Sequence, residues 1–176
     1  MSTFNEWPEH TNIEPSEEEG TAYLEVVAEA FADAPTEQFD PAEWTPVTLA
    51  FDETGQPDGD DERELAFQIE TIEALQEGEP VVTYSAGDEG PDSSVVFVEG
   101  AFGTHSGANG PIRSLGGPTG HSTCYLGPAA SDLTGLRFVG SPTVVDDNTA
   151  TVSVAGERFS EIELGATGSS GVEYSV

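Results

Sequence analysis

Short runs in which apolar and polar residues alternate dominate the sequence from residue 44 onward. Val47, Leu49 and Phe51, for example, alternate with polar or small residues, and a period of two is typical of a half-buried strand. Turn-forming residues separate the runs, which cover residues 47–52, 65–70, 81–84, 95–98, 123–126, 136–139, 143–145, 149–154, 159–164 and 172–176. Successive strands without intervening helices argue against a parallel α/β sheet. The pattern therefore predicts an all-β sandwich or barrel with at most one or two short helices.

Two segments also show helical features. Thr71 is a suitable N-cap for a short helical turn from Ile72 to Glu77, and Gly78 stands where such a turn would end. In residues 21–34, apolar residues recur both at helical spacing and on one face of a strand, so helix and strand both stay open there.

The chain has 176 residues, enough for one domain with a substantial core. Residues 1–20 are expected to form an acidic N-terminal arm, and residues 21–176 a single β-barrel domain. Phe4 and Trp7 are large apolar residues in this arm, and we expect them to dock on a neighbouring subunit. The sequence shows neither a signal peptide nor an apolar stretch of membrane-spanning length.

The net charge of the chain indicates the salt concentration in which it is expected to fold. The sequence has no Lys, and its 34 Asp and Glu outnumber 4 Arg, which gives a formal net charge of -30. Such a chain repels itself in dilute buffer, whereas molar salt shortens the Debye length to about 3 Å. The composition is therefore typical of a protein made for concentrated brine. Four scattered arginines cannot form the basic stripe that binds nucleic acid directly.

The acidic residues are concentrated in the first part of the chain. Residues 1–99 hold 27 acids and one Arg, a net charge of -26, while residues 100–176 hold 7 acids and three Arg, a net charge of -4. Depletion of charge is a mark of interface cores. The later part is therefore either the core or a surface that other proteins cover.

Residues 100–120 contain seven glycines and two prolines, and we expect them to form a long glycine-rich loop. Long loops in compact domains are usually functional or covered. Two uses stay open: a close backbone approach to another subunit, with Arg113 as an anchor, and simple flexibility. A phosphate-binding loop is excluded because such loops need a helix N-terminus and usually a Lys.

Cys124 is the only cysteine, so an internal disulfide is impossible. The favoured interpretation is a small buried apolar residue. The alternative is a thiol that pairs with another subunit, which makes Cys124 an interface candidate beside Phe4, Trp7 and Arg113.

The carboxylate cluster of Asp58, Asp60, Asp61 and Glu62 is the best metal candidate in the sequence. It lacks the fixed spacing of an EF-hand calcium loop. In so acidic a chain, clusters of this density arise from composition alone. We therefore assign no specific metal or cofactor and expect loosely held cations.

No catalytic motif is complete, and we expect no enzymatic activity. The segment Gly120-His-Ser-Thr-Cys124 lacks the second glycine and the following helix of a nucleophile elbow. His105, His121 and Cys124 do not have a recognised zinc spacing.

Four features together resemble one family: the absence of Lys, the missing signal peptide, the ten-strand pattern over residues 44–176, and the glycine-rich, charge-poor second half. The family is that of the small major capsid proteins of tailless icosahedral haloarchaeal viruses that enclose a membrane. The resemblance implies a single upright jelly roll and a structural virion protein, assembled in the host cytoplasm into the virion capsid. Its partners would be further copies and a larger sister capsid protein around an internal membrane vesicle. No short motif carries the likeness, so it assigns no functional residue.

Two other functions are alternatives to the capsid role. One is a β-sandwich binding module, an adhesin or a carbohydrate binder, whose aromatic candidates are Trp7, Trp44, Tyr84 and Tyr125. The other is a cupin-like metalloenzyme that would use His105 and His121.

Overall fold

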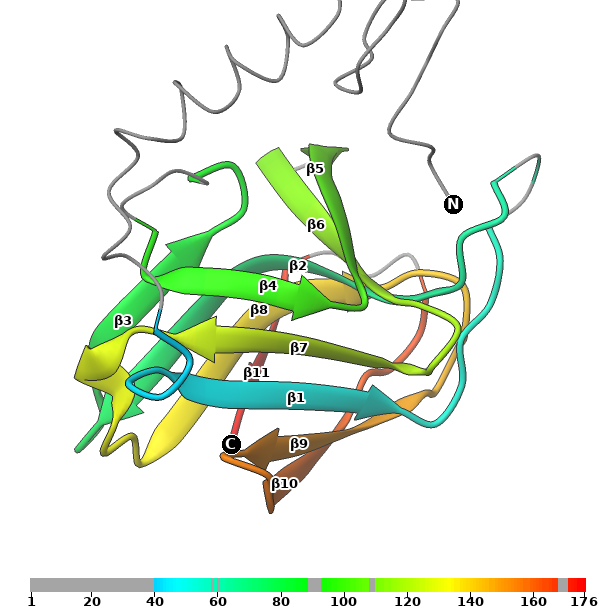
Figure 1. The fold of residues 1–176 in the computed structure, drawn as a ribbon. Helices are drawn as coiled ribbons and strands as arrows, with labels where there is room; N and C mark the ends of the chain where they lie inside the picture. The colour runs from blue at the N-terminus through cyan, green and yellow to red at the C-terminus, as the bar shows by residue number, and fades with distance from the viewer. Residues whose placement is uncertain (1–39, 58, 60, 89–92, 108–109, 168–170) are drawn as a thin grey trace, which may run out of the picture. The chain divides into compact units, whose positions relative to one another are not determined.

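The computed structural model describes residues 40–57, 59, 61–88, 93–107, 110–167 and 171–176 (Figure 1). The chain divides into two units, Met1–Gln38 and Phe39–Val176, and all the described residues belong to the second. The predicted arm at 1–20, with Phe4 and Trp7, lies outside the described residues, as does the ambiguous segment at 21–34. Within the described part, no helix has the length and hydropathy needed to cross a membrane.

Eleven strands in the described residues form two antiparallel sheets that pack as a sandwich. The five-stranded sheet has the order β10-β9-β1-β7-β4, with β10 at Glu157–Glu163, β9 at Thr149–Val154, β1 at Thr45–Phe51, β7 at His121–Leu126 and β4 at Val95–Glu99. The six-stranded sheet has the order β11-β8-β2-β6-β5 with β3 beside β2, and comprises β11 at Val172–Ser175, β8 at Gly135–Pro142, β2 at Leu65–Gln76, β6 at Gly110–Gly116, β5 at Ala101–Gly107 and β3 at Glu79–Ser85. One turn of 3-10 helix, Pro128–Ala130, is the single helical element in this part of the chain. The predicted all-β class is confirmed.

The strands pair in a nested way. β1 pairs with β9, β2 with β8, β4 with β7 and β5 with β6, as in one long antiparallel hairpin that has been rolled up. Pairing of β1 with β7 and of β2 with β6 closes the roll. The nested pairing makes the sandwich jelly-roll-like. Its strand order places β1 between β9 and β7.

Alternation along the strands fills the space between the sheets. Val47, Leu49 and Phe51 of β1 are buried, as predicted. They belong to one core cluster with large side chains of the six-stranded sheet, which include Phe67, Ile69, Ile72, Leu115, Leu136 and Phe138. Burial of each such side chain contributes about 1.5–3 kcal/mol. Apolar burial is therefore the main force that holds the two sheets together.

The helical turn predicted after Thr71 is wrong, because these residues continue β2. In the pairing with β8, a register shift between Ile69 and Thr71 moves the alternation by one residue, and Ile69 and Ile72 are both fully buried although they are three positions apart. That spacing imitates a helix in the sequence. Glu77 and Gly78, with φ values of 52° and 87°, form the tight turn from β2 to β3 rather than a helix end.

The long loop predicted at residues 100–120 is also wrong. The described residues of this segment form the paired strands β5 and β6 and the two places where the chain crosses between the sheets. Gly100, between β4 and β5, has a φ of 62°, and a Cβ there would lie 1.9 Å from the carbonyl oxygen of His121. The Gly100 carbonyl accepts hydrogen bonds from the Gly116 N–H at 2.8 Å and from the Ser122 hydroxyl at 2.5 Å. The close backbone approach that these glycines permit is thus within the chain.

Candidate interaction surface

Apart from His121 at the start of β7, the outward side of the five-stranded sheet carries no ionisable acid or base with a full charge on its three central strands. Because side chains alternate along a strand, the residues between the buried positions of β7, β1 and β9 point outward. They are Thr123 and Tyr125 of β7, Thr48 and Ala50 of β1, and Thr151 and Ser153 of β9. We name these six residues the uncharged face. None of them is acidic, although acids make up 34 of the 176 residues of the chain.

The strand register aligns the uncharged face into rows across the sheet. Thr123 lies opposite Thr48, which in turn lies opposite Ser153. The hydroxyl oxygens of Thr48 and Thr123 are 3.0 Å apart, so the two side chains share a hydrogen bond. In the next row, Ala50 lies opposite Thr151. The result is a surface of neutral side chains, all short except Tyr125, that spans three adjacent strands.

Charged residues stand at the ends of these rows. Glu99 of β4 lies opposite Thr123, and its carboxylate is 3.3 Å from Nε2 of His121. On the far side, Arg158 of β10 forms an ion pair with Glu161. Such exposed pairs contribute little to stability. They give the uncharged face a polar rim, which is the arrangement found at protein interfaces.

Charged residues are also few in the segment that contains β4 and β5, which are edge strands of the two sheets. Residues 93–131 contain one acid, Glu99, and one Arg, Arg113. On β4, the apolar side chain of Val98 is 51% exposed. The strands at the opposite edge, β10 and β11, carry Glu157, Glu161, Glu163 and Glu173. The segment at residues 93–131 is therefore nearly neutral, whereas the edge strands β10 and β11 are acidic.

Arg113, predicted to anchor a neighbouring subunit, is engaged inside its own fold. Its guanidinium carbon lies 4.8 Å from the centre of the Phe97 ring, and its Nε donates a hydrogen bond to Oη of Tyr84 at 3.2 Å. Phe97 belongs to β4 of one sheet and Tyr84 to β3 of the other, and their rings meet edge to face with centroids 5.3 Å apart. Arg113 therefore bridges the two sheets.

Cys124 is 4% exposed and belongs to the core cluster. Burial raises the pKa of its thiol to about 12, so the thiol stays protonated at neutral pH. The predicted small buried apolar residue is confirmed. The alternative, a disulfide with another subunit, does not fit this position, because the thiol lies between the sheets.

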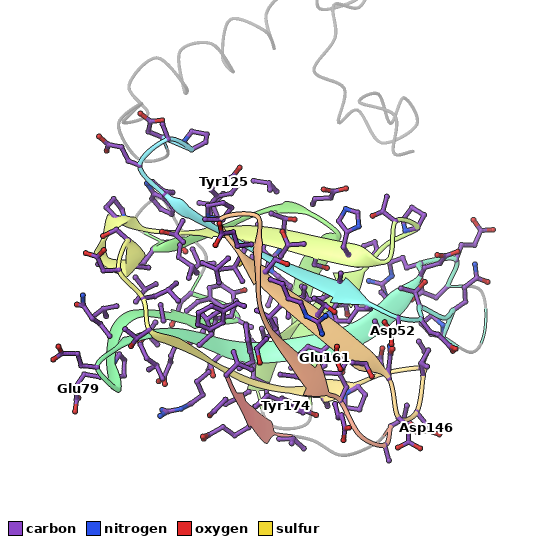
Figure 2. All side chains as sticks on the ribbon, turned by 90° about the horizontal axis from the view of Figure 1, so that it is seen from below. Asp52, Glu79, Tyr125, Asp146, Glu161 and Tyr174 are labelled. Carbon is purple, nitrogen blue, oxygen red and sulfur yellow. The ribbon has the colours of Figure 1, made fainter. Side chains whose placement is uncertain are left out.

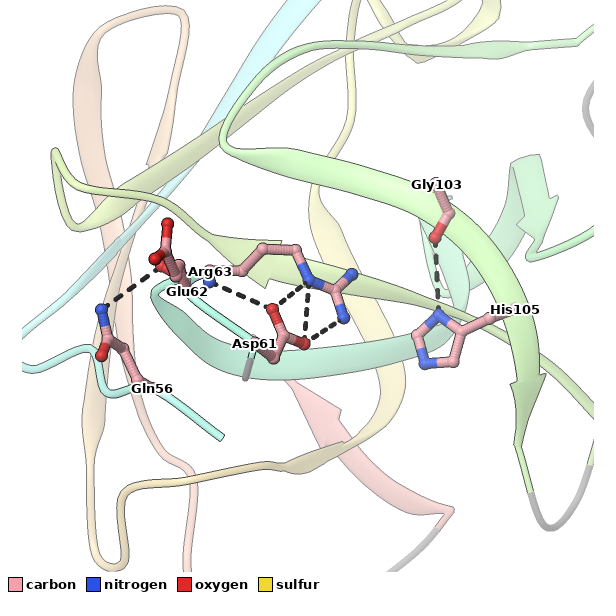
Figure 3. A network of polar contacts seen from close by, with 6 residues as sticks. All are labelled: Gln56, Asp61, Glu62, Arg63, Gly103 and His105. Carbon is pink, nitrogen blue, oxygen red and sulfur yellow. Dashed lines mark hydrogen bonds and ion pairs between the residues drawn. The ribbon is translucent and has the colours of Figure 1, made fainter. Parts of the chain in front are cut away.

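Of the four carboxylates in the predicted metal cluster, Asp61 and Glu62 are described, and Asp58 and Asp60 lie outside the described residues. Asp61 forms a two-point ion pair with Arg63, with Nε–Oδ1 at 2.8 Å and Nη2–Oδ2 at 2.5 Å (Figure 3). Hydrogen bonds from the Arg63 side chain are the main cause that lowers the pKa of Asp61 to about 2. The Asp61 carboxylate is therefore paired with the Arg63 guanidinium.

The two histidines considered for zinc have separate surroundings. Nδ1 of His105 lies 3.5 Å from the carbonyl oxygen of Gly103 (Figure 3), and Nδ1 of His121 lies 3.0 Å from the carbonyl oxygen of Thr119. Across the residues that the structure describes, no three His, Cys, Asp or Glu side chains are grouped so that they could hold a metal ion.

Carboxylates gather at one end of the sandwich, where Figure 2 labels Asp52 and Asp146. Asp52, Glu53, Asp146 and Asp147 line a hollow of about 140 Å³ together with the buried Asn148. The Asn148 side chain donates a hydrogen bond to the Glu53 carbonyl at 2.7 Å and accepts one from the Glu53 N–H at 3.2 Å. The sequence does not mark Asn148 for this role, because it stands in an ordinary turn composition. This end of the molecule therefore has an acidic surface.

The uncharged face is the feature that the sequence analysis missed. Thr48 comes from the acidic first part of the chain and Thr123 from the charge-poor second part, and the strand order brings them together. The alternation around Thr48 was the available signal, because it marks this residue as outward-facing. Comparison of the chain with protein-family models, with curated proteins and with solved structures found no match.

Proposed function

We propose that this protein is a structural virion protein, a small major capsid subunit. It assembles with further copies and with a larger sister capsid protein into an icosahedral shell in concentrated salt. The observation that carries the proposal is the uncharged face on a chain whose net charge is -30. The jelly-roll-like sandwich supports it, since the family that the sequence resembles has a jelly roll. The role is structural and requires no catalytic group or cofactor.

A surface without carboxylates can be covered by another subunit at low cost. A carboxylate at a protein–protein contact loses its hydration, which costs several kcal/mol unless a cation pairs with it. This chain has few cations to offer: Arg63, Arg137 and Arg158 already pair with acids, and Arg113 is engaged with Phe97. The Thr, Ser, Ala and Tyr side chains of the uncharged face avoid that cost. Contact between subunits is therefore favoured there.

Salt controls how closely such subunits can approach one another. Each copy has a formal net charge of -30. At roughly 0.1 M salt, where the Debye length is about 10 Å, the copies repel one another. In molar salt the Debye length falls to about 3 Å, and short-range contacts decide the association. We therefore expect assembly in molar salt and dissociation on dilution.

The test is the assembly state of the purified chain in molar salt, alone and mixed with the larger capsid protein of the same virus. Light scattering after size exclusion gives the mass of the complexes, and electron microscopy shows whether shells form. We expect complexes in molar salt that dissociate at roughly 0.1 M. A chain that stays monomeric under all of these conditions contradicts the proposal.

Charge placed on the uncharged face tests which surface makes the contact. Thr48→Asp and Thr123→Asp each put a carboxylate in the middle of the face, and we expect each to weaken association by about tenfold or more. Thr83→Asp is the matched control, because Thr83 is exposed on β3 of the other sheet. Circular dichroism checks that the three variants keep the fold. If the control weakens association as much as the other two, the contact lies elsewhere.

A further inference from the structure

β5 is an edge strand whose hairpin extends past the sheet. Among the described residues, β5 pairs with β6 alone. β6 pairs with β2 only from Arg113 to Gly116, whereas the residues from Gly110 to Ile112 pair with β5 (Figure 1). A two-stranded ribbon is marginally stable in water, and an edge strand presents backbone N–H and C=O groups to which another strand can pair. A further strand beside β5 would stabilise this hairpin.

β5 lacks the charges that the other edges carry. The strand Ala101–Gly107 contains no Asp, Glu, Arg or Lys, and its residues Gly103, His105 and Ser106 are exposed. The other strands with a single neighbour carry Glu157, Arg158, Glu161 and Glu163 on β10, Glu173 on β11, Glu99 on β4 and Glu79 on β3. Charges on edge strands are a usual protection against pairing between molecules. β5 is the edge without this protection.

We propose that β5 pairs antiparallel with β5 of a second copy of this chain, so that the six-stranded sheets of two subunits become continuous. The proposal rests on the proposed function and names one contact between identical shell subunits. A strand that pairs with its own copy about a twofold axis meets the same residues on the partner. In β5 none of these is charged, whereas pairing of β10 with itself would bring its three Glu residues near those of the second copy. For subunits of net charge -30, β5 is therefore the edge with the least repulsion.

Cysteine cross-linking tests this pairing directly. Cys124 is the only cysteine, so Cys124→Ala gives a background in which each new thiol is unique. Gly103→Cys and His105→Cys then place thiols at exposed positions of β5. Opposite residues of an antiparallel pair have Cβ atoms about 4.5–5.5 Å apart, close to the range of a disulfide. We expect at least one of the two variants to form a covalent dimer under mild oxidation in molar salt.

Phe159→Cys in the same background is the matched control, because Phe159 lies on the charged edge strand β10 and is 38% exposed. We expect it to stay monomeric. A second measurement uses charge: His105→Asp combined with Ser106→Asp should raise the dissociation constant of the homodimer by about tenfold or more, and Phe159→Asp should not. Thermal unfolding in the same salt checks that each variant is folded.

The outcomes separate this proposal from the proposed function. The pairing is overturned if the β5 variants neither cross-link nor change association. It is also overturned if Phe159→Cys cross-links to the same extent, or if the cross-links contain the sister protein instead of a second copy. If Thr123→Asp abolishes assembly with the sister protein while the β5 variants leave all association intact, the shell function stands and the edge pairing fails. A chain that is monomeric with and without the sister protein in molar salt defeats both.

Discussion

The guanidinium of Arg113 on β6 rests against the ring of Phe97 on β4, with 4.8 Å between the guanidinium carbon and the ring centre. Each sheet is thereby held to the other by a cation over an aromatic face. The hydrogen bond from Arg113 to Tyr84 fixes the orientation of the guanidinium plane. This contact ties β6, the neighbour of the uncharged edge strand β5, to the opposite sheet.

Arg113→Ala should lower the free energy of unfolding by about 1–2 kcal/mol, because the contact with Phe97 and the hydrogen bond to Tyr84 are both lost. Urea denaturation in molar salt measures the change. Arg158→Ala is the control, since exposed Arg158 pairs with nearby Glu161 and should change stability by less than about 0.5 kcal/mol. Equal losses in the two variants would show that Arg113 does not bridge the sheets.

Gly100→Ala should cost about 4 kcal/mol or more, or prevent folding. A Cβ at this position would lie 1.9 Å from the carbonyl oxygen of His121, and the φ of 62° disfavours any side chain. Gly103→Ala is the control, because no atom lies within 4 Å of the added Cβ, and it should change stability by less than about 1 kcal/mol. Soluble yield and thermal unfolding in molar salt measure both. A Gly100→Ala protein that melts close to the melting temperature of the parent would mean that the backbone between β4 and β5 can shift to make room for the added Cβ.

Acid should remove the contribution of Asp61 to stability. Its pKa falls from 3.8 to about 2 in the folded chain, so the ion pair with Arg63 stabilises the fold fully above pH 3.8 and is lost as the pH falls through about 2. Asp61→Asn should therefore be slightly less stable than the parent at neutral pH, since an exposed ion pair contributes little, and the difference should vanish by about pH 2. Carbon NMR of the Asp61 carboxyl gives the midpoint directly. In Arg63→Gln that midpoint should rise, and an unchanged midpoint would rule out Arg63 as the cause.

Cys124 should be inert toward thiol reagents in the native protein. Its pKa of about 12 and its burial leave little thiolate at about pH 8. Labelling should be slow in molar salt and reach one thiol per chain after unfolding in urea. Assembly should be insensitive to reductant. Rapid stoichiometric labelling of the folded chain would contradict the core position.

Alternation located the strands whose two faces differ most in burial. In β1, Val47, Leu49 and Phe51 are buried between outward neighbours, and the sequence shows that contrast. β5 has no such contrast, because none of its residues is fully buried, and its glycines suggested a loop instead. The shift between Ile69 and Thr71 hid the second half of β2 for a related reason: a bulge breaks the period on which the prediction depends.

The difference in net charge between residues 1–99 and 100–176 indicated that part of the surface is covered, but it did not show which residues form that surface. One of the three residues in the row Thr123–Thr48–Ser153 comes from β1, in the acidic part of the chain, because the nested pairing sets Thr48 between the other two. No local pattern states which strands become neighbours. The same holds for Arg113, whose partners Phe97 and Tyr84 lie on strands that the sequence does not connect with it. Local composition therefore predicted that a surface poor in charged residues exists, whereas the pairing of strands distant in the sequence determines which residues form it.

Nested pairing also sets the order of events during synthesis. β1 is the neighbour of β9, with Leu49 beside Val152, so the ribosome must release almost the entire chain before that ladder can form. Until then the apolar side of β1 has no complete cover, and late long-range contacts make folding slow and expose the nascent chain to aggregation. A polypeptide that stops before Thr149–Val154 has no finished five-stranded layer. Prematurely terminated chains are thus prevented by their own topology from completing the sandwich.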